Sequence, residues 1–376
     1  MLGERIRQAR LAAGLTVRGL AEKVGVSHSA ISKYEIGEDR PRQSVLLAIA
    51  QALHVRTSFF LKPTEVELAV VEFRRKASFS DAKADQVRAR VQVDLQPYIE
   101  LSEIWAAGKS GRTAHRLPTP KTMVSLDAVE TFAEHVRGEW QIGLAPITNV
   151  IELVESVGVK VLTTNAGDGF DEMAGIANGE YPVVVVKNLD EGKGDRQRFD
   201  VLHGLGHLLL RPGDGIDKEK MCHRFAAAML VPRTAAIRCL GSHRRTLDLD
   251  FELQQLKREY GLSIKGWIGR ACDLGIVSST ACTNLYKQLS WRHWNKDEPV
   301  KVLLETPTHF RKMVYQARAE GIITEVRAAE YLGELSAKRL KSVRTEDIPQ
   351  SAITDYSAGG ALHLDTSYLI EETASE

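Results

Sequence analysis

The stretch that decides the fold is residues 194–235, GDRQRFDVLHGLGHLLLRPGDGIDKEKMCHRFAAAMLVPRTA. It is predicted to form two helices joined by the turn RPGDGID at 211–217, because glycine, proline and aspartate favour turns over helix. The first helix carries His203 and His207, whose spacing of four residues places both imidazoles on one face. Two histidines arranged in this way are suited to hold a metal ion.

The residue after His203 decides what such a site could do. In the HExxH motif of zinc peptidases, a glutamate at this position takes a proton from the attacking water. Here the position is Gly204, so the ligand pair is present and the base is absent. Losing a general base costs roughly 10²–10⁴-fold in rate. Glycine inside a helix also costs about 1 kcal/mol relative to alanine, and the sequence offers no reason for it.

Candidates for a third metal ligand follow the turn. Glu219, Cys222 and His223 each carry a suitable donor atom, and Cys222 with the two histidines would form a reasonable zinc set. The alternative is that Cys222 packs as a small apolar residue and that His223 makes a hydrogen bond near the turn. The sequence leaves the third ligand open. The sequence does not by itself require a cofactor. If the site holds one, its residue types suggest zinc.

Residues 2–61 are predicted to be helical throughout, in short pieces. Thr16 and Ser27 can cap helices that end at Gly25 and Gly37. A helix, a turn at Gly25 and a second helix have the spacing of a helix-turn-helix. Residues 1–62 contain ten lysines and arginines against five acidic residues, which suits an anionic partner.

Three segments, RIRQARLAAGLT, LAEKVGVSHSAISKYEIGEDRP and LLAIAQAL, resemble the XRE/Cro-type DNA-binding domain. The resemblance implies that the start of the recognition helix, His28, Ser29 and Ser32, contacts base edges in the major groove. It implies phosphate contacts for Lys33 and Arg42. One such domain reads only half a site, so the expected state is a homodimer on a double-stranded operator. The alternative is a helical bundle used only for protein contacts.

Further along the chain, FRRKA, WQIGLAPITNVIELVESVGVKV, DRQRFDVLHGLGHLLL and HRFAAAMLVP resemble the ImmA/IrrE-type metallopeptidase family, fused to an N-terminal XRE domain. The resemblance implies a minimal zincin fold, and a role as a protease of repressors or as a regulator and antitoxin-like partner. It also aligns Met221 with the family's third ligand, usually glutamate, and a thioether is a poor zinc ligand.

The predicted class is α+β, with a small sheet that includes 69–74 and YPVVVV packed against the two-helix hairpin. Five segments are expected: a helix-turn-helix domain at 1–63, a helical connector and linker at 64–120, a zincin-like domain at 121–240, a helical region at 241–345 and an acidic tail at 346–376. The tail holds seven acidic residues and no lysine or arginine.

These features predict a sequence-specific DNA-binding transcriptional regulator, an antitoxin or phage-type repressor. Its metallopeptidase-like domain is expected to be catalytically inactive and to act as a sensor or to bind a partner, a co-encoded toxin or regulatory protein. Two alternatives are an active zinc metallopeptidase that cleaves a regulatory protein and a toxin-neutralising scaffold. The absence of a signal segment and of a long apolar run predicts a cytoplasmic protein without a membrane partner. Four cysteines without a CxxC pair predict reduced thiols.

Overall fold

The computed structural model describes residues 2–61, 66–108, 117–242 and 246–333. The chain divides into two compact units, residues 1–310 and 311–376. The predicted acidic tail at 346–376 lies outside the described residues. The other predicted segment boundaries stay predictions.

The N-terminal helices form the predicted helix-turn-helix arrangement. They are α1 (Leu2–Ala12), α2 (Val17–Val24), α3 (His28–Ile36), α4 (Gln43–Ala52) and α5 (Thr57–Leu61). The hydroxyls of Thr16 and Ser27 accept hydrogen bonds from backbone N–H groups in the first turns of α2 and α3. Gly25 and Gly37 end these helices with φ of 74° and 81°, a left-handed conformation that favours glycine. The predicted caps and stops are therefore confirmed.

A four-stranded sheet follows, which with the surrounding helices confirms the α+β class. Its strands are β1 (Leu68–Arg75), β3 (Lys160–Thr164), β4 (Phe170–Ala177) and β5 (Tyr181–Lys187), in the order β1-β4-β5-β3. β4 runs antiparallel to both β1 and β5, and β3 runs parallel to β5. Two short strands, β2 (Lys121–Met123) and β6 (Leu210–Pro212), pair in parallel elsewhere.

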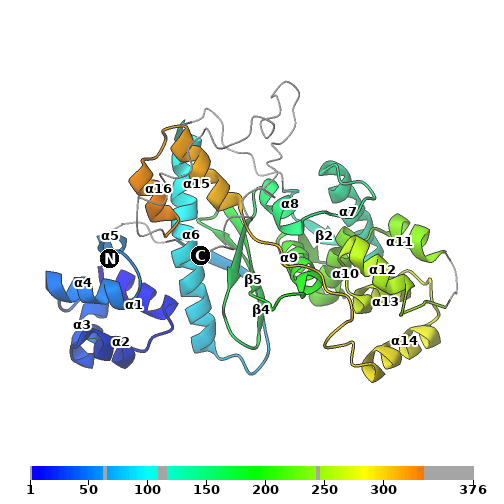
Figure 1. Ribbon diagram of the computed structural model, residues 1–376, viewed down its shortest axis with the longest axis horizontal. Coiled ribbons are helices and arrows are strands. Elements are labelled where there is room, and N and C mark those ends of the chain that lie inside the picture. Colours follow the sequence, from blue (N-terminus) through cyan, green and yellow to red (C-terminus); the bar gives the residue numbers. More distant parts are fainter. Residues whose placement is uncertain (1, 62–65, 109–116, 243–245, 334–376) are drawn as a thin grey trace, which may run out of the picture. The chain divides into compact units, whose positions relative to one another are not determined.

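Helices cover both faces of the sheet (Figure 1). Side chains alternate between the faces along a strand, so Val183 and Val185 of β5 join the core under α6 (Asp81–Gly108). Val184 and Val186 join the opposite core, under α9 (Gly194–Leu209) and α10 (Lys218–Leu230). The predicted two-helix hairpin is thus α9 and α10, and it packs on one face of the sheet as expected.

Helix α6 also contacts the helix-turn-helix domain. It packs against α1, where the buried Arg5 guanidinium donates to Oε1 of the buried Gln96. The same guanidinium lies 3.7 Å from the ring centroid of Phe59. One helix therefore joins the core of the sheet to the helices of the helix-turn-helix domain.

The remaining helices of the first unit contribute side chains to the same hydrophobic core as α9 and α10. They are α7 (Leu126–Glu139), α8 (Val150–Ser156), α11 (Arg233–Leu240), α12 (Glu252–Tyr260), α13 (Ile264–Asp273) and α14 (Ser279–Trp291). The prediction of four reduced thiols is wrong for one pair, because Cys272 and Cys282 form a disulfide that joins α13 to α14. These cysteines are ten residues apart, and a turn between two packed helices brings them together.

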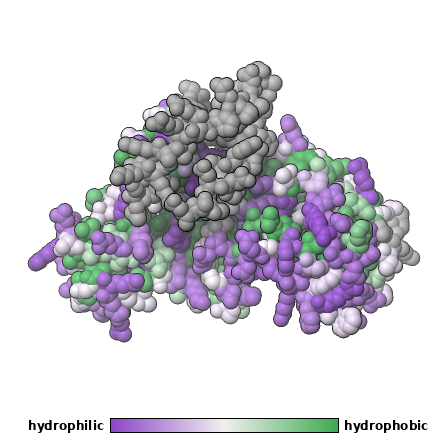
Figure 2. Space-filling view, in the orientation of Figure 1, coloured by the Kyte–Doolittle hydropathy of each residue, from purple (hydrophilic) through white to green (hydrophobic). Residues whose placement is uncertain are grey.

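Helix α15 (His309–Ala319) begins at the end of the first unit, and α16 (Glu325–Tyr331) lies in the second unit. Across the described ranges, every helix is too short or too polar to span a lipid bilayer. On the face seen in Figure 2, the coloured residues are mainly hydrophilic, and hydrophobic residues gather in small separate groups.

Candidate metal centre and DNA-binding surface

The two histidines of α9 lie side by side in the interior, with no exposed surface on either side chain. The ring centroids of His203 and His207 are 4.8 Å apart. In the described residues, the Nε2 atoms of both are buried without a hydrogen-bond partner. Burying a nitrogen atom without a hydrogen-bond partner costs free energy of folding, and such atoms are rare in folded proteins. Two of them side by side therefore need an explanation. A bound metal ion would provide it.

Glu219 supplies a third donor from α10. Its Oε1 lies 3.4 Å from Nε2 of His207, and its Oε2 lies 3.6 Å from Nε2 of His203. Ligand atoms around a tetrahedral zinc ion, with bonds of about 2.1 Å, lie about 3.4 Å apart. Glu219 therefore approaches both histidines at distances that suit ligands of one metal ion, which makes it a candidate for the third ligand that the sequence left open.

The other candidates for the third ligand take different positions. Cys222 is buried, and its Sγ lies 3.4 Å from Nδ1 of His207, on the opposite edge of that ring from Nε2. Burial raises the pKa of this thiol, which keeps it protonated. His223 stays close, with its ring centroid 4.7 Å from that of His203, and can form a donor group with His203 and Glu219. Met221 is fully buried in the apolar core.

Glu172 of β4 was not among the residues predicted from the sequence. This fully buried carboxylate is hydrogen-bonded through Oε1 to Nδ1 of His203. A carboxylate that holds the far nitrogen of a ligating histidine fixes the ring and leaves Nε2 free for a metal. Burial raises the pKa of Glu172 well above its ordinary value. The signal for it was a pair of acidic residues, Asp171 and Glu172, inside the otherwise apolar strand FDEMAGIA.

A second carboxylate, Glu72 of β1, approaches the other histidine. Its Oε2 lies 3.9 Å from Nδ1 of His207 and accepts a hydrogen bond of 2.6 Å from Nζ of Lys218. Burial lowers the pKa of His203 to about 4 and that of His207 to about 3. Both rings are therefore neutral near pH 7, which is the form that binds metal.

The glycine at the position of the missing base has a reason that the sequence could not show. A Cβ atom on residue 204 would lie 2.9 Å from Cγ1 of Val184 on β5, closer than Cβ contacts ordinarily come. Gly204 therefore lets α9 approach the sheet. Close packing of this helix on the strand is the reason for glycine at position 204.

The predicted DNA-contacting residues lie together at α3 and the start of α4. His28, Ser29 and Lys33 are exposed on α3, and Ser32 is partly buried. Arg42 is exposed at the N-cap position of α4. Within the described part of the chain, Lys33 and Arg42 form no ion pair with an acidic side chain. Their charges therefore remain available to an outside partner.

Two family models match the chain, a helix-turn-helix model over residues 6–60 and an IrrE N-terminal-like domain model over residues 154–265. The second range includes β3, β4, β5, α9 and α10, and therefore the whole candidate metal centre except Glu72.

Two similar proteins are regulators by name. The chain is 32% identical over 72 residues to an SPbeta prophage-derived uncharacterized HTH-type transcriptional regulator, YonR, of Bacillus subtilis, covering 19% of this chain and 67% of that protein. It is 42% identical over 64 residues to an uncharacterized transcriptional regulator in the ATPase CF(0) region of Rhodospirillum rubrum, covering 17% of this chain and 59% of that protein. No solved structure matches. The chain belongs to the XRE-type helix-turn-helix family of transcriptional regulators and carries an IrrE N-terminal-like domain after its DNA-binding helices.

Proposed function

We propose that the protein is a homodimeric, sequence-specific transcriptional regulator whose IrrE N-terminal-like domain holds one metal ion and does not hydrolyse peptides. The observation that carries the non-catalytic role is Gly204, which lies against Val184 in the same helix that carries His203 and His207. The metal would then serve structure or sensing.

The DNA-binding part of the proposal rests on exposed groups of the helix-turn-helix domain. His28 and Ser29 lie at the start of α3, where a recognition helix meets base edges. Lys33 and Arg42 have no acidic partner among the described residues, so they can neutralise phosphates without breaking an internal ion pair. A single domain of this type reads one half-site, which supports a dimer.

The metal-binding part rests on three side chains. His203 and His207 would each offer Nε2, and Glu219 a carboxylate oxygen, while Glu172 holds the ring of His203. A metal bound there would supply a Lewis acid. A peptidase also needs a group that takes a proton from water, and Gly204 has no side chain with which to do so.

The contact between α1 and α6 gives the second domain a route to the first. Gln96 of α6 is held by Arg5 of α1, and α6 packs on the sheet that carries Glu172. A change at the metal centre that shifts the sheet would therefore reach the helix-turn-helix domain through packed side chains. We further propose a co-encoded toxin or regulatory protein as the partner of the second domain, and co-expression followed by affinity purification tests it.

A mobility-shift assay with the DNA upstream of the gene tests the regulatory function. We expect binding that prefers this DNA over a scrambled duplex and weakens with salt. His28→Ala combined with Ser29→Ala should abolish the preference, whereas the exposed residue Lys287 of α14 offers a control, Lys287→Gln, that should leave binding unchanged. Equal affinity of the unmodified protein for both duplexes would overturn the proposal.

A further inference from the structure

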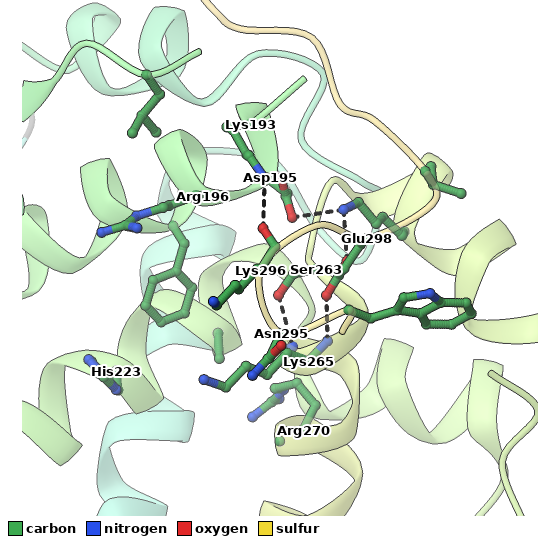
Figure 3. A pocket seen from close by; sticks show the side chains of 18 of the residues that line it. Lys193, Asp195, Arg196, His223, Ser263, Lys265, Arg270, Asn295, Lys296 and Glu298 are labelled. Atoms are coloured by element: carbon green, nitrogen blue, oxygen red, sulfur yellow. Dashed lines mark hydrogen bonds and ion pairs between the residues drawn. The ribbon is translucent and has the colours of Figure 1, made fainter. Parts of the chain in front are cut away.

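A cavity of about 790 Å³ lies beside the candidate metal centre. Its lining comes from the start of α9, from α10, from α13 and from residues 294–301. His223 of α10 forms part of the wall, and its ring is the one that lies 4.7 Å from the ring of His203. Figure 3 shows His223 to one side of the group formed by Lys265, Lys296 and Arg270. The cavity and the candidate metal centre therefore share a side chain.

The lining is strongly basic. It contains ten lysine and arginine side chains against four aspartate and glutamate side chains. Two of the four carboxylates, Asp195 and Glu298, are already engaged by buried Lys257, with Nζ–oxygen distances of 2.9 and 2.7 Å. Glu298 also accepts hydrogen bonds from the backbone N–H groups of Ile264 and Lys265, at the start of α13. Most of the other basic side chains pair with acids outside the lining, among them Lys187, Lys193, Arg196 and Lys301.

Three lysines on three different elements have no such partner. Lys220 of α10, Lys265 of α13 and Lys296 are exposed and form no ion pair within the described ranges. Among the four carboxylates of the lining, Asp190 is the one that forms no ion pair in the same ranges. The lining therefore has three unpaired positive charges against one unpaired negative charge. Three like charges directed at one space repel each other unless an anion lies between them.

The two arginines deeper in the wall, Arg224 and Arg270, are engaged by acidic side chains. Arg270, which has no exposed surface, and Arg224 both bind the carboxylate of Glu130. In the described part of the chain, Nε of each arginine is buried without a hydrogen-bond acceptor. These Nε atoms are closed off from solvent, so a ligand in the cavity does not reach them.

We propose that this cavity binds a small polyanion, a ligand with two or more phosphate or carboxylate groups, held by Lys220, Lys265 and Lys296. The volume lies in the range of about 300–1,000 Å³ that is usual for small-molecule sites. Lysine binds such groups as a compact point charge. The proposal goes beyond DNA binding, and it can fail or hold independently of the regulatory function because it is tested without DNA.

Isothermal titration of the full-length chain with pyrophosphate and with citrate, at constant ionic strength, tests this site. We expect saturable binding of at least one of the two, with one site per chain, and the stronger ligand identifies the preferred group. Lys265→Gln combined with Lys296→Gln should weaken binding by about tenfold or more, because two charge-assisted contacts are lost. Lys121→Gln combined with Lys287→Gln removes two exposed lysines outside the cavity and should leave affinity unchanged.

Thermal melting of both double variants checks that they are folded. Absence of saturable binding of both anions to the unmodified chain would overturn the proposal. So would equal weakening in the two double variants, since that would indicate attraction by total charge.

Discussion

A Cβ atom on Gly204 would lie 2.9 Å from Cγ1 of Val184, so the position that carries the base in zinc peptidases is closed by β5. The loss of the glutamate is therefore part of how α9 packs on the sheet. The donor atoms for a metal belong to other side chains, His203, His207 and Glu219, so holding a metal does not require a side chain at position 204.

Alanine at position 204 is expected to destabilise the protein, although alanine favours helix by about 1 kcal/mol over glycine. The new methyl group must displace Val184, and overpacking of this kind costs about 1–3 kcal/mol. Gly138 of α7 gives a matched control, because a Cβ there would meet nothing within 4 Å. Urea unfolding should show Gly138→Ala unchanged or more stable.

The double variant Gly204→Ala with Val184→Ala tests whether the contact with Val184 causes the destabilisation. The cost of alanine at 204 should fall when Val184 is truncated, with a coupling of about 0.5–3 kcal/mol. If the two costs simply add, the contact with Val184 is not the reason for glycine. Gly204→Glu is expected to show no peptidase activity, because its side chain starts against β5.

Metal analysis of protein purified without chelator is expected to give one divalent ion per chain. His203→Ala, His207→Ala and Glu219→Ala should each lose it, because each removes a donor. Cys222→Ala should keep it, because the thiol faces Nδ1 of His207 and burial raises the thiol pKa. Retention of metal by Glu219→Ala together with loss in Cys222→Ala would assign the third ligand to the cysteine.

Glu172→Ala is expected to weaken metal binding without removing a ligand. The carboxylate holds Nδ1 of His203, and loss of such an orienting partner costs about 10–100-fold in affinity. Glu172→Gln keeps an acceptor oxygen and should recover part of the affinity. Competition with a coloured chelator measures both variants. Equal affinity of Glu172→Ala and the unmodified protein would show that His203 needs no orienting carboxylate.

Lys160 of β3 should make stability depend on pH. Burial lowers its pKa to about 8 from an ordinary value of 10.5, and its Nζ lies 4.4 Å from the ring centroid of Tyr98. Between these two pKa values the unfolded chain binds more protons than the folded chain, so stability rises with pH. The free energy of unfolding should rise by about 3 kcal/mol in total across this range, because each unit of pKa difference contributes about 1.4 kcal/mol.

Urea unfolding at pH 7 and pH 10 measures this effect, with Lys160→Met as the reference. The stability of the unmodified protein relative to the Met variant should increase at pH 10, because Met does not titrate. A constant difference across this range would mean that the amine keeps its ordinary pKa in the folded state.

The sequence by itself determined the features that depend on residues close together along the chain. Thr16, Ser27, Gly25 and Gly37 act on backbone groups a few residues away, so the helix-turn-helix could be predicted in detail. The pairing of His203 with His207 follows in the same way, from the helical repeat. The apolar run at 181–186 identified β5 because a strand buried on both faces needs no polar alternation.

Only the tertiary structure decided what lies around these elements. Glu172 reaches His203 from β4, 31 residues earlier, and sheet register determines which side of the strand it occupies. The rotation of α10 turns Glu219 toward the histidines and Met221 into the core. The reason for Gly204 lies 20 residues away, on β5, because close packing depends on which surfaces meet. Local preferences act through the backbone of a few residues, whereas ligand sets and packing contacts depend on distances that only the folded chain fixes.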